Sequence, residues 1–480
     1  MEKIQKFLLP YVKEANAVLS DYILIILLVG VGLFFTIRTR FVQVRFFGEG
    51  MKRVFGNIKM RGGKNKEGGL SSFQALATAI AAQVGTGNIV GASGAILVGG
   101  PGAIFWMWII AFLGMATIYA EATLAQETRI VDENGEIHGG PVYYIKRAFK
   151  GGFGKFLAGF FAVAITLALG FMGSMVQSNS IAESACNAIG VNYLDWGWIV
   201  GILLAAIAAF IFIGGIKRIA SVTEKLVPLM AIFFLLGGLV VVCVRIKYIP
   251  ETFGMIFKYA FTPNAIIGGT VGAAIKTAIS QGAKRGLFSN EAGMGSTPHA
   301  HAQANVENPH QQGTVAMIGV FIDTFVVLTM TAIVVISCLY AGNGALSAGA
   351  NDSLITKTNA MQTAFGQVFS QLFGSDIGGT IGSVFVAICL LFFAFSTIIS
   401  WNFFGKINVQ YLFKNSKVAV TIYSVIAVAF VFLGTLLSND LVWELTDFFN
   451  YLMVIPNAIA LFALSNLVVN CSKTPKLKKR

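Results

Sequence analysis

The sequence predicts an all-α polytopic membrane protein of about eleven transmembrane helices, with one extra helix ahead of two inverted repeats of five. Three observations support this fold class. Hydrophobic residues make up 56% of the 480 residues and charged residues only 12%, whereas soluble domains are about a quarter charged. Apolar segments long enough to cross a bilayer recur along the chain. Two glycine-interrupted segments also occupy matching positions in its two halves.

The predicted elements form a single transmembrane domain over residues 1–480. The extra helix is placed at 19–37, the first repeat at 71–246, the second repeat at 266–468 and a basic tail at 469–480. Because five is an odd number, the second repeat must enter the membrane from the opposite side. The expected spans are 19–37, 71–98, 102–125, 156–184, 195–215, 222–246, 266–300, 313–340, 377–404, 416–437 and 443–468.

Lysine and arginine residues predict the orientation of these spans. The loop at 38–66 carries nine of them, whereas the loops near 186–195 and 438–442 carry none. Basic loops favour the cytoplasmic side of a membrane. The amino terminus is therefore expected outside and the carboxyl terminus in the cytoplasm, across the cell membrane. This asymmetry accounts for the net charge of +13, so no nucleic-acid partner is expected.

The sequence also argues against several other classes of protein. The five cysteines, at 186, 243, 338, 389 and 471, are scattered and odd in number, which implies no disulfide framework. The first 18 residues lack a compact apolar region followed by a cleavage site, so they are interpreted as mature sequence. No phosphate-binding loop or nucleophile–base pairing indicates an enzyme or an ATP-driven pump.

The first glycine-interrupted segment is Phe73–Gly91, FQALATAIAAQVGTGNIVG. Irregular backbone at membrane depth is tolerated only where protein buries it or a wet cavity faces it. A helix broken there directs carbonyl groups one way and amides the other, which attracts a cation to one end and an anion to the other. A zwitterion with a metal ion is the simplest cargo. The alternative is that the glycines only allow close helix packing.

A second such segment lies 199 residues downstream, since Ala75–Gly87 aligns without gaps with Ala274–Gly286. The matching break in this second segment is expected at Ser280-Gln281-Gly282. Paired broken helices of this kind indicate a transporter's binding site near the bilayer midplane. Short amphipathic segments precede corresponding spans of the two repeats, at 46–55 and 250–261, and at 139–149 and 358–369.

Three stretches resemble the signatures of the alanine/glycine:cation (sodium:alanine) symporter family. They are SSFQALATAIAAQVGTGNIVG, GGPGAIFWMWIIAFLGMATIYAE and ISQGAKRGLFSNEAGMGSTPHAHA. The resemblance covers nearly the whole chain and implies a LeuT-type fold. It also implies uptake of small neutral amino acids such as alanine and glycine, with D-alanine or serine as further candidates, by alternating access. Sodium would be the coupling ion, with no other cofactor, and a monomer in the lipid bilayer would be the functional unit.

The resemblance places a sodium ion between the first break and the span at 377–404. The carbonyl groups of Ala81 and Val84 would face the ion, and the hydroxyl groups of Ser396 and Thr397 would complete its shell. Hydroxyl groups within a helix also bond to their own helix, which is the alternative for this pair. The Gln83 carbonyl and the Asn88 side chain would hold a further cation; a helix cap is the alternative for Asn88.

The substrate is expected between the same breaks. The amides of Gly85, Thr86 and Gly87 would receive its carboxylate, and Ser280 its ammonium group. Gln177 is a candidate contact, with helix–helix hydrogen bonding as the alternative. Trp401 would limit side-chain volume unless it is an interfacial anchor. The full substrate set is Thr78, Gln83, Gly85, Thr86, Gly87, Gln177, Ser280, Gln281, Gly282 and Trp401.

Charged residues in the spans suggest gating or coupling roles. Lys284 and Arg285 are expected on the cytoplasmic half, either as a gate paired with Glu291 or with their charges at the interface. If coupling is to protons, Asp323 and Glu121 are the first candidates. His299 and His301 are expected at the surface. Alternatives to a sodium-coupled alanine carrier are a proton-coupled carrier, a glutamine carrier and, more remotely, a passive channel or amino-acid sensor.

Overall fold

The computed structural model describes residues 2–56, 69–133, 135–213, 215–262, 271–347, 354–437 and 439–473. Four of the nine basic residues expected in the first loop lie outside these described residues, at 59, 61, 64 and 66. So do the start of the seventh expected span (266–270), residue 438 and the tail from 474. Within them, the chain is mostly helical, and its one small sheet is an antiparallel pair of two-residue strands.

The elements up to the end of the first predicted repeat are α1 (Glu2–Val18), η1 (Leu19–Leu24), α2 (Ile25–Arg38), α3 (Val42–Arg45), α4 (Phe47–Phe55), α5 (Ser72–Gln83), η2 (Gly87–Gly91), α6 (Ala92–Gly99), α7 (Ala103–Thr128), β1 (Ile130–Val131), β2 (Ile137–His138), α8 (Pro141–Ala148), α9 (Gly151–Ile165), η3 (Thr166–Gly173), α10 (Ser174–Ile189), α11 (Tyr193–Ile213) and α12 (Gly215–Val244). The later elements are η4 (Ile246–Tyr248), α13 (Ile249–Phe261), α14 (Val271–Asn290), α15 (Pro298–Ala302), α16 (Pro309–Val320), η5 (Phe321–Leu328), α17 (Thr329–Leu339), α18 (Ala360–Phe373), α19 (Ser375–Leu412), α20 (Lys417–Gly434), α21 (Asn439–Ala463) and α22 (Ser465–Lys473).

Nine helices in the described ranges are long and apolar enough to cross a membrane, or ten if the bent pair at 72–99 is one span. These ten segments coincide with ten of the eleven expected spans. The remaining one, expected at 266–300, corresponds to α14, which fails the same test of length and composition. Its polar residues lower its hydropathy, and they make contacts inside the protein that are described below.

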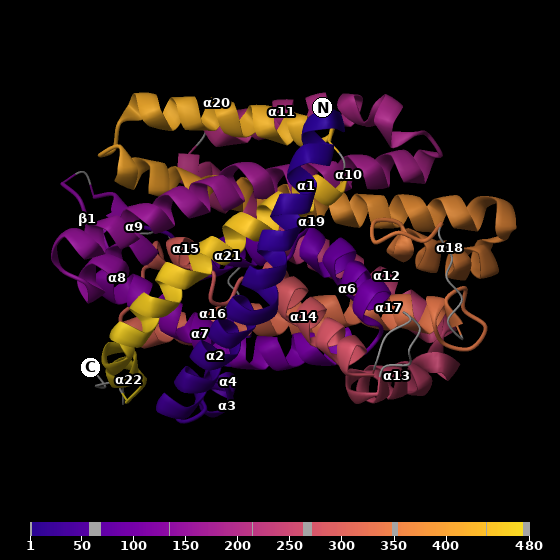
Figure 1. Ribbon diagram of the computed structural model, residues 1–480, viewed down its shortest axis with the longest axis horizontal. Coiled ribbons are helices and arrows are strands. Elements are labelled where there is room, and N and C mark those ends of the chain that lie inside the picture. Colours follow the sequence, from indigo (N-terminus) through magenta and orange to yellow (C-terminus); the bar gives the residue numbers. More distant parts are fainter. Residues whose placement is uncertain are drawn as a thin grey trace.

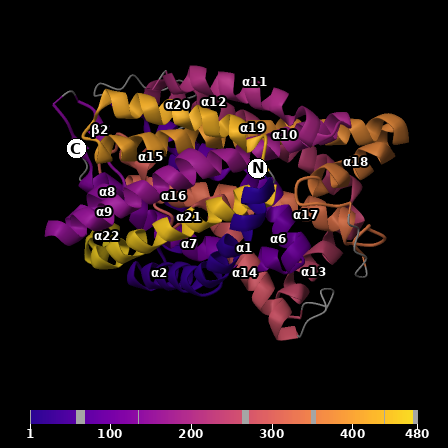
Figure 2. The same ribbon diagram turned by 45° about the horizontal axis from the view of Figure 1, so that its top comes forward.

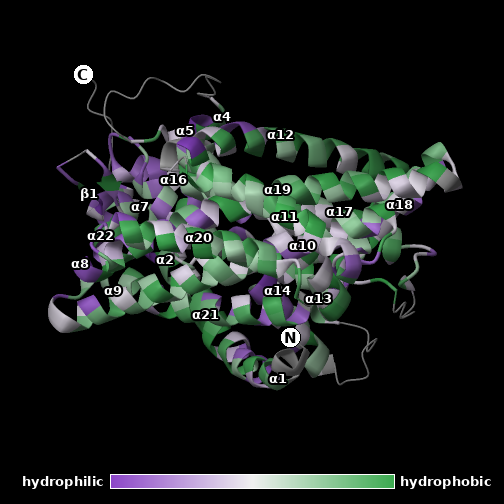
Figure 3. Cartoon of the chain, turned by 90° about the horizontal axis from the view of Figure 1, so that it is seen from above, coloured by the Kyte–Doolittle hydropathy of each residue, from purple (hydrophilic) through white to green (hydrophobic). Residues whose placement is uncertain are grey.

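The two ends of the molecule are distinct. Figure 1 shows α13 and α18 at one end and β1, α8 and α22 at the other; we call these the α18 end and the hairpin end. Figure 2 shows α19 running between α10 and α20, and both helices contact it. In Figure 3, hydrophobic residues predominate along α11, α12 and α20, which bear many exposed aliphatic and aromatic side chains. This surface is suited to contact with lipid.

The first break lies where the sequence predicts it. Helix α5 begins with a capping box, in which the side chain of Ser71 accepts the Gln74 amide and the Gln74 side chain accepts the Ser71 amide. The helix ends at Gln83 because Val84 has the non-helical ψ of 85°. The chain resumes as η2 and α6 after a bend of 45°. Every residue of the break is buried.

The second break is not where the sequence predicts it. Helix α14 runs unbroken through Ser280-Gln281-Gly282 and ends at Asn290. Gly282 serves close packing, because a Cβ there would lie 2.6 Å from the Cβ of Trp106 on α7. The chain turns after Asn290, where three residues take positive φ values before Pro298 starts α15; they are Glu291 (57°), Gly293 (98°) and Gly295 (77°). The break therefore follows the expected position by about two turns.

The four amphipathic segments expected before corresponding spans are helices α4, α13, α8 and α18. The first span is longer than expected, because the apolar helical segment covers Phe7–Arg38 instead of 19–37. It contains the π-helical segment η1, which carries Ser20, Asp21 and Tyr22.

Candidate functional site

The two breaks meet in the interior of the protein. The Gln83 side chain, at the end of α5, donates from Nε2 to the carbonyl oxygen of Asn290 at 2.8 Å. Beyond the break, Gly87 lies against Ser289, and a Cβ at Gly87 would be 3.0 Å from the Cα of Ser289. Both interrupted helices therefore end at one place. Only a glycine at 87 permits this approach without movement of α14.

The amides of the first break have partners that mimic a carboxylate. The Thr86 amide donates to Oε1 of Gln177, on α10, at 3.0 Å. The Gly85 amide donates to the Gln83 carbonyl and to Oδ1 of Asn88, each at 3.0 Å. Within the described part of the chain, Nε2 of Gln177 and Oγ1 of Thr86 are buried and have no hydrogen-bond partner. A buried polar atom without a partner is costly, so this region is suited to a polar ligand.

The predicted sodium residues gather at the end of α5. The Thr397 hydroxyl donates to the Ala81 carbonyl oxygen at 2.8 Å, and that of Ser396 approaches the same oxygen at 3.4 Å. Both hydroxyl groups also bond to Phe393 of their own helix, α19. A Cβ at Gly85 would lie 2.4 Å from Oγ1 of Thr397. Three neutral oxygen atoms thus converge beside the break, and sodium prefers such hard oxygen ligands.

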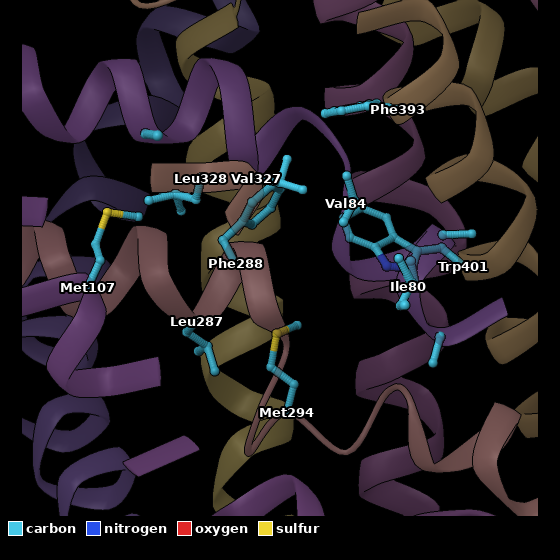
Figure 4. Close-up of a cluster of buried hydrophobic side chains, with 14 of the residues drawn as sticks. Ile80, Val84, Met107, Leu287, Phe288, Met294, Val327, Leu328, Phe393 and Trp401 are labelled. Carbon is cyan, nitrogen blue, oxygen red and sulfur yellow. The ribbon is translucent and has the colours of Figure 1, made fainter. Parts of the chain in front are cut away.

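Trp401 closes this region toward the hairpin end. Its side chain lies beside Ile80 and Val84 (Figure 4), is only 1% exposed, and meets Phe288 edge-on at a centroid distance of 5.8 Å. The indole Nε1 donates to Oε1 of Glu291, on the turn after α14, at 2.5 Å. Trp401 is therefore a buried residue of the site and not an interfacial anchor. Its position is fixed by the second break.

Two fully buried carboxylates hold the breaks. Asp323, on η5, accepts from Nδ2 of Asn88 at 2.6 Å and from the Ser289 hydroxyl at 2.9 Å, so it touches both broken helices. Glu121, on α7, accepts the amides of Gly293 and Gly295 at 3.1 and 2.9 Å. Within the described ranges, neither carboxylate forms an ion pair. The neutral donors around them supply the stabilisation.

The expected gate between Arg285 and Glu291 is not formed. Arg285 pairs with Asp447 of α21 at 2.9 Å and lies over the ring of Trp443, 4.6 Å from its centroid. Lys284 pairs with Asp21 of η1 at 3.4 Å. Both cations precede the true break, so they lie toward the α18 end and not toward the basic hairpin end. The sequence placed them after a break at 280–282, whereas α14 is continuous there and both precede its end at Asn290.

Several residues expected at the substrate site face other helices. Thr78 contacts the hydroxyl of Thr223 on α12 at 3.2 Å. Ser280 donates to Oδ1 of Asp21 at 2.6 Å. The Cβ of Gln281 lies where Gly99 permits close approach of α6. Helix α14 is continuous here, so neighbouring side chains point to different faces and cannot share one site.

The histidines of the PHAHA segment are not surface residues. His299 is 0% exposed and stacks between Phe161 and Phe404. His301 is 1% exposed, and burial lowers its pKa to about 3, which leaves it neutral at physiological pH. The sequence placed this segment at the surface end of a span, whereas the structure buries it after the turn that follows Asn290.

Three polar residues that contact or belong to α14 were not assigned a role from the sequence. Asp21 and Asp447 lie in segments that read as apolar spans, and Ser289 lies in the polar run before the second break. A charged residue within a span is a functional candidate on its own. The two aspartates, paired here with adjacent cations of α14, could have been identified by that criterion.

Comparison with known proteins shows the family. Residues 5–479 match the sodium:alanine symporter family. The chain is 41% identical over 464 residues to the sodium/alanine symporter AgcS of Methanococcus maripaludis, with 96% of each chain covered. It is 37% identical over 477 residues to the "Probable sodium/glutamine symporter GlnT" of Bacillus subtilis, covering 99% of this chain and 92% of the relative.

A third relative is a candidate sodium/proton-dependent alanine carrier of Bacillus subtilis, YrbD. It is 38% identical over 473 residues, which cover 98% of this chain and 93% of the relative. The family match extends over nearly the whole chain and includes both breaks. With its many apolar helices, this multi-pass membrane protein belongs to the sodium:alanine symporter family of transporters.

Proposed function

We propose that this protein is a secondary active symporter that couples inward sodium movement to uptake of alanine and other small neutral amino acids. The observation that carries the proposal is the first break. There the Thr86 amide faces a side-chain carbonyl, and three oxygens of Ala81, Ser396 and Thr397 converge beside it. A site for an anion and a site for a cation are thus adjacent, as a zwitterion carried with sodium requires.

In this proposal the substrate carboxylate replaces Oε1 of Gln177 at the Thr86 amide. The Gln177 side chain then turns its Nε2, which has no partner among the described residues, toward the carboxylate. The amides of Gly85 and Gly87 contribute the positive end of the helix that follows. Trp401 and Phe288 bound the space for the side chain, which favours alanine and glycine over glutamine.

Sodium is proposed to sit among the carbonyl groups of Ala81 and Val84 and the hydroxyl groups of Ser396 and Thr397. These ligands carry no net charge, so the bound ion keeps its full charge and the membrane potential acts on its movement. The hydroxyl groups, which now donate to Ala81 and Phe393, would turn their lone pairs to the ion. This pairing of α5 with α19 is part of the LeuT-type five-plus-five arrangement that we propose for the two repeats.

A further cation is proposed at Asp323 instead of at the Asn88 oxygen. Oδ1 of Asn88 is occupied by the Gly85 amide, and its Nδ2 donates to Asp323. Asn88 therefore caps the break and orients the carboxylate. Asp323 is buried without an ion pair in the described part of the chain, and a sodium ion or a proton would neutralise it. A proton there would give the proton-coupled alternative.

The structure supports transport by alternating access, because barriers flank the site on both sides. Arg285, Asp447 and Trp443 lie toward the α18 end, and Trp401 with Glu291 lies toward the hairpin end. The basic hairpin end is proposed to face the cytoplasm. In this orientation, sodium and substrate enter past the Arg285–Asp447 pair and leave past Trp401.

The proposed coupling is energetically sufficient. One charge crossing about 100 mV releases about 2.3 kcal/mol, and a tenfold sodium gradient adds about 1.4 kcal/mol. One sodium ion per substrate could therefore sustain roughly a 500-fold accumulation of a neutral amino acid. A passive channel would achieve no accumulation at all.

Uptake by the purified protein in proteoliposomes tests the function. Radiolabelled alanine uptake is measured with an inward sodium gradient, with an inward proton gradient and with neither, and with unlabelled glycine, serine or glutamine as competitor. We expect accumulation with sodium and strong competition by glycine. Accumulation driven by protons alone would make the proton the coupling ion, with Asp323 and Glu121 as the residues to test next. Equal uptake without any gradient would favour a passive pathway.

A further inference from the structure

The first span, which lies outside the two predicted repeats, makes polar contacts with one face of α14. Asp21 accepts a hydrogen bond from Ser280 at 2.6 Å and forms ion pairs of 3.4 Å with both Lys284 and Lys276. The three partners are spaced by four residues, so they lie on one stripe of the helix. Asp21 itself lies in the π-helical segment η1, a local geometry that is frequent at functional sites.

The same span also holds α21. Asn16 donates from Nδ2 to the backbone carbonyl and the carboxylate of Glu444, at 2.8 and 2.7 Å. Helix α21 is in turn joined to α14 by Asp447 and Arg285. Polar contacts therefore connect each pair among the first span, α14 and α21. Those made by α14 come from the part of this helix that precedes its break. Apolar packing alone would hold a peripheral helix in place, so these contacts indicate a more specific role.

The contacts are suited to repeated opening. Individual hydrogen bonds between helices in membranes are weak on average. Asp21 and Lys284 retain 21% and 17% side-chain exposure, so water can replace each partner when they separate. Arg285, the next residue after Lys284, lies against Gly91 of the first broken helix. A Cβ added at Gly91 would be 3.8 Å from the side chains of both Arg285 and Trp443. The contact between Asp21 and Lys284 therefore also fixes the position of the Arg285–Trp443 barrier, which covers the site.

We propose that Asp21 is a positioning residue for transport: through Ser280 and Lys284, the first span clamps α14 and keeps the site closed toward the α18 end. We call Asp21, Ser280 and Lys284 the Asp21 clamp. It must release when the site opens on that side. The clamp rests on the proposed function for its role in uptake, but its effect on access to the site is measurable without any transport.

A cysteine at Gly91 reports that access. Its Cβ fits, since no neighbouring atom would lie within 3.8 Å, and the Arg285–Trp443 barrier covers it. Labelling by a charged, membrane-impermeant thiol reagent is followed in the full-length protein, with the exposed Cys243 and partly exposed Cys471 replaced by serine. We expect Asp21→Asn to raise the labelling rate at least fivefold. Lys276→Ala is the matched control, because Lys276 contacts the same carboxylate but its side chain is 54% exposed; it should leave the rate unchanged.

A reversible disulfide between the first span and α14 supplies a second test, which is needed in case Asp21→Asn does not fold. In the Asp21→Cys/Ser280→Cys double variant, a disulfide should form on oxidation and reduce labelling of the Gly91 cysteine below the parent rate, and reductant should reverse it. The single-cysteine variants control for other modification. The proposal is overturned if folded Asp21→Asn labels at the parent rate, or if the oxidised double variant labels as fast as the reduced one. Failure of the proposed function would instead appear as absent alanine uptake with these labelling differences intact.

Discussion

At the scale of single residues, Gln177 and Trp401 support the proposal that one site accepts a small zwitterion. Gln177 holds the Thr86 amide with its oxygen and leaves its Nε2 without a partner in the described structure. Trp401 fills the space against Gly173, where a Cβ would lie 2.4 Å from the indole ring. In the proposed site, Gln177 would offer a polar group to the substrate carboxylate, and Trp401 would limit the volume available to the substrate side chain.

Gln177→Glu should weaken alanine binding. A glutamate carboxylate would accept the Thr86 amide more strongly than the amide oxygen does, and it would repel the incoming substrate carboxylate. We expect the alanine concentration for half-maximal uptake to rise at least tenfold, equivalent to about 1.4 kcal/mol. This concentration is measured from the rate of uptake as a function of alanine concentration at saturating sodium. An unchanged alanine dependence would show that the substrate carboxylate binds elsewhere.

Trp401→Ala should admit amino acids with larger side chains and weaken the binding of alanine and glycine. The change removes the indole that lies beside Ile80 and Val84 and also its hydrogen bond to Glu291. Trp401→Phe separates the two effects, because it keeps most of the volume and loses the N–H donor. Competition of a panel of amino acids against labelled alanine measures both variants. If Trp401→Ala keeps the wild-type profile, Trp401 does not bound the substrate.

At the scale of elements, the two breaks differ in how far the sequence revealed them. The first was predictable because Gly85, Thr86, Gly87 and Asn88 all disfavour a continuous helix and act locally. The second was misplaced because the two halves were aligned at a fixed offset. Gly282 looked like a break, yet it is a packing contact with α7. Only the three-dimensional contacts distinguish a glycine that bends a helix from one that lets a neighbour approach.

The same limit applies to the side chains around the breaks. The convergence of Ser396 and Thr397 on Ala81 was expected from the family resemblance, and the structure brings them together. The pairing of Asp323 with both broken helices was not expected, because it depends on how α16 and η5 pack. Sequence patterns predict the residues that a site needs more readily than the partner each residue takes.

Glu121→Ala should destabilise the second break. It removes the acceptor for the Gly293 and Gly295 amides and for Nδ2 of Asn457. Each buried donor left unsatisfied costs about 1–3 kcal/mol, so the thermal midpoint in detergent should fall by several degrees. Glu121→Gln keeps an oxygen acceptor, so its thermal midpoint should lie between those of Glu121→Ala and the wild type. An unchanged midpoint in Glu121→Ala would show that the turn is held by other contacts.

At the scale of the whole molecule, the first broken helix links three functions. Its end would bind the proposed sodium with α19, its Thr86 amide faces α10, and its continuation packs against α14 beneath the Arg285–Trp443 barrier. An ion bound at Ala81 would therefore stabilise the same arrangement of helices that forms the proposed substrate site. Ligands that share an arrangement in this way bind cooperatively. Sodium should accordingly increase the affinity for alanine, and alanine that for sodium.

The central claim is that sodium binds where α5 and α19 meet, and the sodium dependence of alanine uptake tests it most directly. Uptake at fixed alanine is measured over a range of sodium concentrations in wild type, Ser396→Ala, Thr397→Ala and Thr397→Ser, with equal amounts of folded protein in the liposomes. Each alanine variant loses one hydroxyl ligand, so the sodium concentration for half-maximal uptake should rise at least severalfold. Thr397→Ser keeps the oxygen and should stay close to wild type. Wild-type sodium dependence in both alanine variants would contradict the claim.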